Sequence, residues 1–205
     1  MTDKLQNDIK NLIKELNFNG QKKFKLIVLF GLLGDFDSFE YAINLKNFID
    51  NHQDKNLDIF AIAIGNKNGK QKFCKFTGFQ EENLIVVSDN QIHNDLKVSR
   101  GLDIGLGGWI NMLLMLSGIN SFKQVFGDGY LRPFELATFR LNNMKEIIQN
   151  WSDYILNEEY LPQRGASFLL NNKNQIIYKF FSNDILGYSS NMRDPLGFLL
   201  SLIHI

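Results

Sequence analysis

The residues best placed to do chemistry stand in one short turn. Asp35, Asp37 and Ser38 follow the apolar run 26–30, which is typical of a strand buried on both faces. Apolar residues recur at helical spacing from residue 36 onward, so these three polar residues are candidate caps of a helix. A helix N-terminus after a buried strand is a frequent functional site, and its free N–H groups favour anions, thiolates and carboxylates. This turn carries two carboxyl groups and a hydroxyl group, but no cysteine.

Each of these side chains has a structural and a chemical interpretation. Ser38 is most simply a helix cap, with a catalytic role as the alternative. Asp35 and Asp37 are expected to cap the same helix or to balance its dipole, rather than to act as acid or base.

Cys74 is the only thiol of the chain, which excludes an intramolecular disulfide. Its neighbours Phe73 and Phe76 favour a buried structural cysteine, and a catalytic thiol is the alternative.

Metal and cofactor sites have little support in the sequence. The three histidines are scattered with no second ligand at metal spacing, and their segments are expected to point away from the turn: His52, His93 and His204. The glycine-rich stretch 100–108 does not follow a predicted strand and lacks dinucleotide-binding spacing. We therefore expect neither a metal nor a cofactor.

Composition narrows the class of protein. The chain has 205 residues and a formal net charge of zero, with 22 basic and 22 acidic residues, so nothing favours nucleic acid or a membrane surface as a partner. The N-terminus is polar, unlike a signal peptide, and the apolar run 109–116 is too short to span a membrane. These features predict a soluble cytoplasmic protein.

Periodicity and turn residues predict an alternation of helices and strands. The expected elements are a helix within 1–20, a strand at 26–30, a helix from 36, a strand at 57–65, a helix at 67–79, a strand at 84–87, a short helix near 90–96, a long helix from 133, hairpin strands at 166–170 and 175–181, and a helix at 195–203. The early strands imply a parallel pair, and the last two form an antiparallel hairpin.

This order predicts an α/β fold, a thioredoxin-like sandwich with helices on both faces of a mixed sheet. We expect one domain over 1–205, with an N-terminal helix at 1–20 and a helical insertion at about 109–151. The apolar face of the long helix is expected to include Leu141, Met144 and Ile148.

Two segments carry a resemblance to a known family. Residues 34–42 and 164–170 resemble segments of the peroxiredoxin-like group of the alkyl hydroperoxide reductase and thiol-specific antioxidant (AhpC/TSA) superfamily. In related members a Cys-x-x-Cys followed by Arg-Glu-x-Ala occupies the turn, whereas here Asp35 and Ser38 stand where the cysteines would be. The second segment, which starts at Arg164, resembles the family's Arg-Gly-x-Phe-Ile-Ile-Asp. The resemblance implies that Arg164 belongs to the site, since this arginine holds the thiolate and orients the peroxide in active members.

The missing cysteine bears on function, because peroxide reduction needs a thiolate that can become a sulfenic acid, and a serine does neither. We predict a peroxiredoxin-like protein of antioxidant type without the cysteine peroxidase mechanism. The alternative is a non-catalytic module that holds a partner or small ligand at the former active-site turn. Expected partners are another protein, a thioredoxin-type reductant or a second copy of the chain. We further expect Arg164 to hydrogen-bond to Asp35 or Asp37, directly or through one water.

Overall fold

A mixed β-sheet forms the centre of the protein. The computed structural model describes residues 2–18, 20, 22–52, 56–100, 133–182, 188–189 and 194–203. Within these residues the sheet has the order β3-β2-β1-β4-β5. Its strands are β1 (Phe24–Leu32), β2 (Leu57–Ile64), β3 (Leu84–Val87), β4 (Ala166–Leu170) and β5 (Ile176–Phe181). β1, β2 and β3 are parallel, while β4 pairs antiparallel with β1 and with β5, so the predicted βαβ units and hairpin are confirmed.

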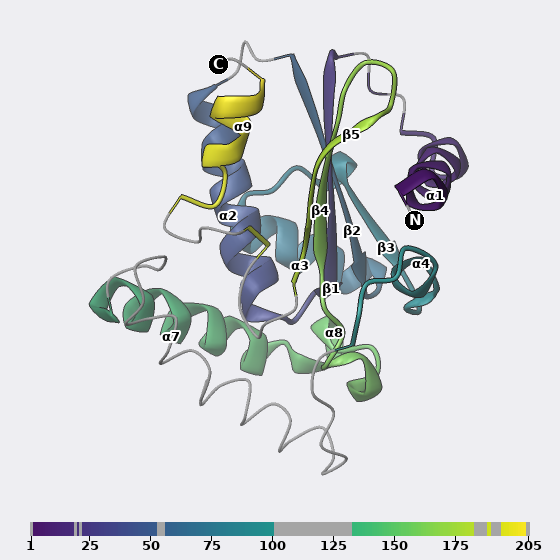
Figure 1. The fold of residues 1–205 in the computed structure, drawn as a ribbon. Helices are drawn as coiled ribbons and strands as arrows, with labels where there is room; N and C mark the ends of the chain where they lie inside the picture. The colour runs from purple at the N-terminus through teal and green to yellow at the C-terminus, as the bar shows by residue number, and fades with distance from the viewer. Residues whose placement is uncertain are drawn as a thin grey trace.

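Helices cover both faces of the sheet (Figure 1). The α-helices are α1 (Thr2–Glu15), α2 (Phe36–Asn51), α3 (Lys67–Thr77), α4 (Gln91–Asp95), α7 (Pro133–Gln149), α8 (Trp151–Tyr154) and α9 (Gly197–Leu202), with short 3-10 turns η1 (Glu81–Asn83) and η2 (Glu158–Tyr160). α1 and α4 lie on one face, and α2 and α9 on the other. The α/β sandwich expected from the sequence is therefore what the chain forms.

β1 joins the two cores because every residue of the strand is buried. Leu26 and Val28 pack in the core that includes residues of α2, α3 and α9, whereas Ile27 and Leu29 pack in the core that includes residues of α1. This alternation is the two-residue period of a strand. The site described below lies where this strand ends.

The long helix α7 differs from its predicted packing. It begins at Pro133 as expected, but Leu141 and Ile148 are 58% and 51% exposed. Asn143 and Ile147 are buried instead. Helical periodicity predicts an apolar stripe, but which side of the stripe is covered depends on α2, against which α7 packs.

The end of the first helix differs from its prediction, and some predicted segments lie outside the described residues. The first helix ends at Glu15, and Asn17 follows with a left-handed φ of 50°. The glycine-rich stretch beyond Arg100 and the start of the proposed insertion, 101–132, lie outside the described residues. In the part of the chain that is described, no helix is long and apolar enough to cross a membrane.

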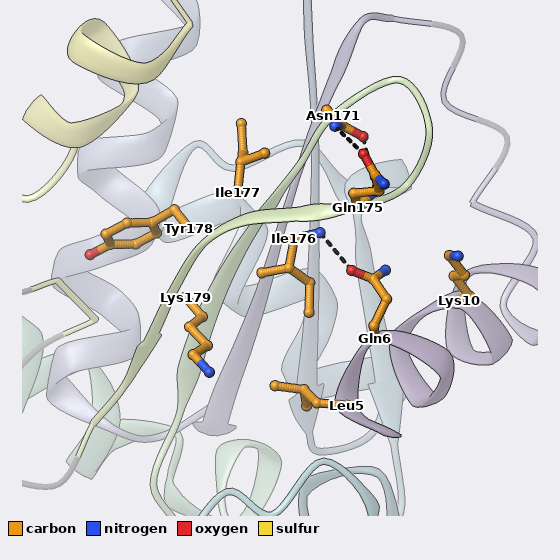
Figure 2. A pocket seen from close by; sticks show the side chains of 9 residues that line it. All are labelled: Leu5, Gln6, Lys10, Asn171, Gln175, Ile176, Ile177, Tyr178 and Lys179. Carbon is orange, nitrogen blue, oxygen red and sulfur yellow. Dashed lines mark hydrogen bonds between the residues drawn. The ribbon is translucent and has the colours of Figure 1, made fainter. Parts of the chain in front are cut away.

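α1 contacts the sheet at its β5 edge, beside a groove of about 530 Å³ (Figure 2). The side-chain amide of Gln6 accepts a hydrogen bond from the Ile176 N–H at 2.8 Å and donates one to the Asn174 carbonyl. Gln6 thus takes the place of a neighbouring strand at the start of β5. Such cover matters because an open strand edge can pair with other chains.

Candidate functional site

Asp35 is the cap that starts α2. Its backbone is extended, with φ −81° and ψ 132°, and its Oδ1 accepts a hydrogen bond from the Asp37 N–H at 3.3 Å. Of the three candidate caps in the turn, the structure therefore selects Asp35. Ser38 lies three residues after this cap, in the first turn of the helix, so the interpretation of Ser38 as the cap is wrong.

Ser38, Asp35 and Tyr188 form a hydrogen-bonded cluster. Ser38 Oγ lies 3.2 Å from Asp35 Oδ2 and 2.9 Å from the Tyr188 hydroxyl, which lies 3.1 Å from Asp35 Oδ2. The Gly31 N–H also donates to the Tyr188 hydroxyl, at 3.1 Å. Ser38 and Tyr188 are buried, and Asp35 is half-buried. We call these three side chains the Asp35 cluster.

The number of protons in the Asp35 cluster depends on the charge of Asp35. When the Asp35 carboxyl group is ionised, only the two hydroxyl protons of Ser38 and Tyr188 are available for the three oxygen–oxygen contacts. When the carboxyl group is protonated, its proton allows all three contacts to be hydrogen bonds. Burial raises the pKa of Asp35, while the charge of Arg164 and hydrogen bonds from the Asp37 amide, Tyr188 and Ser38 partly oppose this rise. Burial, followed by the charge of Asp35, raises the pKa of Tyr188 well above its usual value. Tyr188 is therefore a neutral donor at neutral pH.

Arg164 lies beside the cluster without a direct bond to it. Its charge lowers the pKa of Asp35, yet within the described residues its guanidinium makes no hydrogen bond or ion pair. Arg164 is half-buried and its Nε atom is buried. The predicted proximity of Arg164 to the turn is therefore confirmed, while the hydrogen bond to Asp35 or Asp37, direct or through one water, stays a prediction.

Two glycines allow the segments of the site to meet. A Cβ at Gly165 would overlap the Tyr188 ring and the Leu29 carbonyl oxygen. A Cβ at Gly31 would overlap the carbonyl oxygen of Gln163. Close approach explains why glycine follows Arg164 in the sequence and why glycine ends the apolar run.

Comparison with known proteins identifies the family. Residues 44–184, which are more than half of the chain, match the family described as AhpC/TSA antioxidant enzyme. The chain belongs to this family. A comparison with curated proteins found no match. The matched region includes Arg164 and both hairpin strands but begins after Asp35 and Ser38, so the family's fold and redox type apply while the chemistry of the turn must be argued from its own residues.

The AhpC/TSA fold of this chain is thioredoxin-like, and its only thiol lies apart from the turn. Cys74 is buried on α3, and burial, with a smaller effect of Glu81, raises its pKa to about 11. It shares none of the hydrogen bonds or charge interactions described for Asp35. The predicted burial of Cys74 is confirmed, and the structure does not bring it to the Asp35 cluster.

The sequence missed the most connected side chain of this AhpC/TSA site. Tyr188 is 150 residues from Ser38 and carries no local motif. His93 was expected to point elsewhere, but its Nε2 lies 2.7 Å from the carbonyl oxygen of Phe30, the residue before Gly31. Among the described residues there is no group of three or more histidine, cysteine or acidic side chains that could hold a metal.

We predict that Cys74 reacts slowly with a thiol reagent in the folded protein. A pKa of about 11, against 9.0 for an exposed cysteine, lowers the thiolate fraction roughly 100-fold, and burial restricts access further. Labelling with a chromogenic disulfide at pH 7 should be at least about a hundredfold faster after denaturation. Equal rates in the two states would contradict the structural interpretation.

The raised pKa of Asp35 predicts that the charge of this carboxylate lowers the stability of the folded protein, and that the effect depends on pH. The unfolded chain loses this proton at lower pH than the folded one, so stability falls as the pH rises from the ordinary pKa toward the folded pKa. Asp35→Asn keeps a capping oxygen without the charge. Its free energy of unfolding at pH 7 should match or exceed that of the unmodified chain, and the advantage should vanish below about pH 4.

Asp35→Ala is the control for this experiment. It also removes the charge, but it removes the cap and should cost about 1 kcal/mol. Chemical denaturation of the three proteins across pH 3–8 measures the difference, and an Asp35→Asn variant as unstable as Asp35→Ala at pH 7 would contradict the prediction.

Proposed function

We propose that this AhpC/TSA protein does not reduce peroxides through a cysteine and that its former active-site turn binds a ligand. The observation that carries the proposal is the Asp35 cluster itself. Where related proteins carry thiols, a buried hydroxyl hydrogen-bonds to a carboxyl group and a phenol.

The chemistry of the cluster supports the loss of peroxidase activity. A peroxidatic thiolate attacks one peroxide oxygen, the O–O bond breaks, and the sulfur becomes a sulfenic acid that a second thiol reduces. Neither the Ser38 hydroxyl nor the Asp35 carboxyl group can pass through this reversible oxidation. Cys74 is buried with a raised pKa, so it is a poor substitute nucleophile.

Arg164 supports the binding part of the proposal. A half-buried guanidinium without a hydrogen bond to any described residue has its donors available for a ligand. Guanidinium groups bind carboxylate and phosphate groups through paired hydrogen bonds. The burial that favours a neutral Asp35 also reduces its repulsion of an anion beside Arg164. The ligand we propose is a small molecule or peptide end with an anionic group.

Peroxide consumption tests the first part. With hydrogen peroxide and either dithiothreitol or a thioredoxin system, the purified chain should not raise the rate above the protein-free background. An active peroxiredoxin in the same assay is the positive control. Thiol-dependent turnover that Cys74→Ser abolishes would instead favour the antioxidant enzyme that family membership suggests.

Anion binding tests the second part. Phosphate, acetate and citrate, screened by thermal shift at constant ionic strength, should include at least one anion that stabilises the unmodified chain and not Arg164→Ala. Arg100→Ala is the control, because it removes the same charge from an arginine whose guanidinium already donates to the Glu159 carbonyl. Equal stabilisation of all three proteins, or of none, would refute an anion site at Arg164.

The expected partners stay predictions. A protein partner and a homodimer are compatible with a binding module, whereas a thioredoxin-type reductant requires the enzyme interpretation. Light scattering on the purified chain measures its oligomeric state.

A further inference from the structure

A buried histidine lies behind the candidate site. His93, on α4, is fully buried, and its Nε2 lies 2.7 Å from the Phe30 carbonyl oxygen. A carbonyl oxygen can only accept, so Nε2 carries the proton of the neutral ring. Nδ1 is buried and has no hydrogen-bond partner among the described residues. The Phe30 carbonyl is therefore the one group to which the His93 ring is hydrogen-bonded there.

The acceptor of this bond is part of the site. The carbonyl of Phe30 and the N–H of Gly31 are the two ends of one trans peptide group. That N–H donates to the Tyr188 hydroxyl at 3.1 Å, and Tyr188 contacts both Ser38 and Asp35. A hydrogen-bonded line thus runs from His93, through the peptide, to the Asp35 cluster.

The line passes from one face of the sheet to the other. α4 lies on the α1 face, where its neighbour Leu96 joins the core that contains Ile9 (Figure 1). Tyr188 belongs to the opposite core, with Phe39 of α2. The peptide at the end of β1 is the group that connects them.

Hydrogen bonds in such a line strengthen one another. A donor at the carbonyl polarises the peptide, which makes its N–H a better donor to the next group. The Gly31 N–H occupies an acceptor position of the Tyr188 oxygen, so the phenol proton points to Ser38 or Asp35.

We propose that His93 is a positioning residue of the candidate site: by holding the Phe30–Gly31 peptide, it fixes Tyr188 as a hydrogen-bond donor to Asp35 or Ser38. The proposal is independent of what the site binds. It distinguishes His93 from a core residue that only fills space, because a space-filling residue would leave the Asp35 cluster unaffected.

The test compares His93→Leu with His93→Gln. Leucine fills the space without a donor, whereas glutamine offers an amide N–H to the Phe30 carbonyl. The readout is the titration midpoint of the Asp35 carboxyl carbon, followed by NMR. Since the Tyr188 hydrogen bond lowers the pKa of Asp35, His93→Leu should move the midpoint upward by about 0.2–0.5 on the pH scale, and His93→Gln should restore it.

Leu96→Ala is the control for lost stability on the same face, because Leu96 is buried beside α4 but takes no part in the line. It should destabilise the protein and leave the Asp35 midpoint unchanged. An unchanged midpoint in His93→Leu, or an equal change in Leu96→Ala, would overturn the proposal.

A reciprocal measurement on Tyr188 tests the proposal if the His93→Leu variant does not fold. In Tyr188→Phe, which keeps the ring but not the hydroxyl, the ¹⁵N shifts of the His93 ring and of the Gly31 amide should both change. A change at Gly31 with none at His93 would show that the two hydrogen bonds are uncoupled, and would overturn the proposal.

Discussion

β1 is buried along its whole length, so the peptide that ends its apolar run must find hydrogen-bond partners inside the protein. An unpaired buried backbone group costs as much as a lost hydrogen bond. The Phe30 carbonyl is satisfied by His93, and the Gly31 N–H is satisfied by Tyr188. Both partners are side chains from segments distant in the sequence. This requirement brings α4, the start of α2 and the chain after β5 to one point.

A second buried side chain holds the segment that carries Arg164. The Gln163 amide donates to the carbonyl groups of Val98, Ser99 and Arg164, and its oxygen accepts from Asn90. These bonds join the residues before β4 to the region around α4. The position of Arg164 beside Asp35 follows from this attachment, because the ends of β1 and β4 are already paired in the sheet.

Local sequence patterns predicted the elements because each is fixed by its own residues. β3 was predicted with the limits that the structure has, and the hairpin follows from two apolar runs around a polar turn. The packing of α7 was mispredicted for Leu141 and Ile148, since a helical period does not show which neighbours cover the helix. Residue patterns alone predicted the site only where it is local, since Asp35 and Ser38 are three residues apart in one turn, and the place of Arg164 beside them was predicted from the family resemblance. Tyr188 and His93 reach it through long-range packing, for which a single sequence gives no signal.

The N-terminus of α2 acts on a carboxyl group in this chain, whereas in related peroxidases the same helix start acts on a thiolate. A thiolate needs a positive field that keeps it ionised, and the α2 N-terminus and Arg164 supply one here. In this chain that field acts on a carboxyl group whose burial has the opposite effect, so the net direction is toward the neutral acid. A neutral Asp35 forms its hydrogen bonds with Ser38 and Tyr188 and does not require an ion pair with Arg164. Among the described residues the guanidinium of Arg164 has no hydrogen-bond partner, and this is the feature on which the proposed change from peroxide reduction to ligand binding rests.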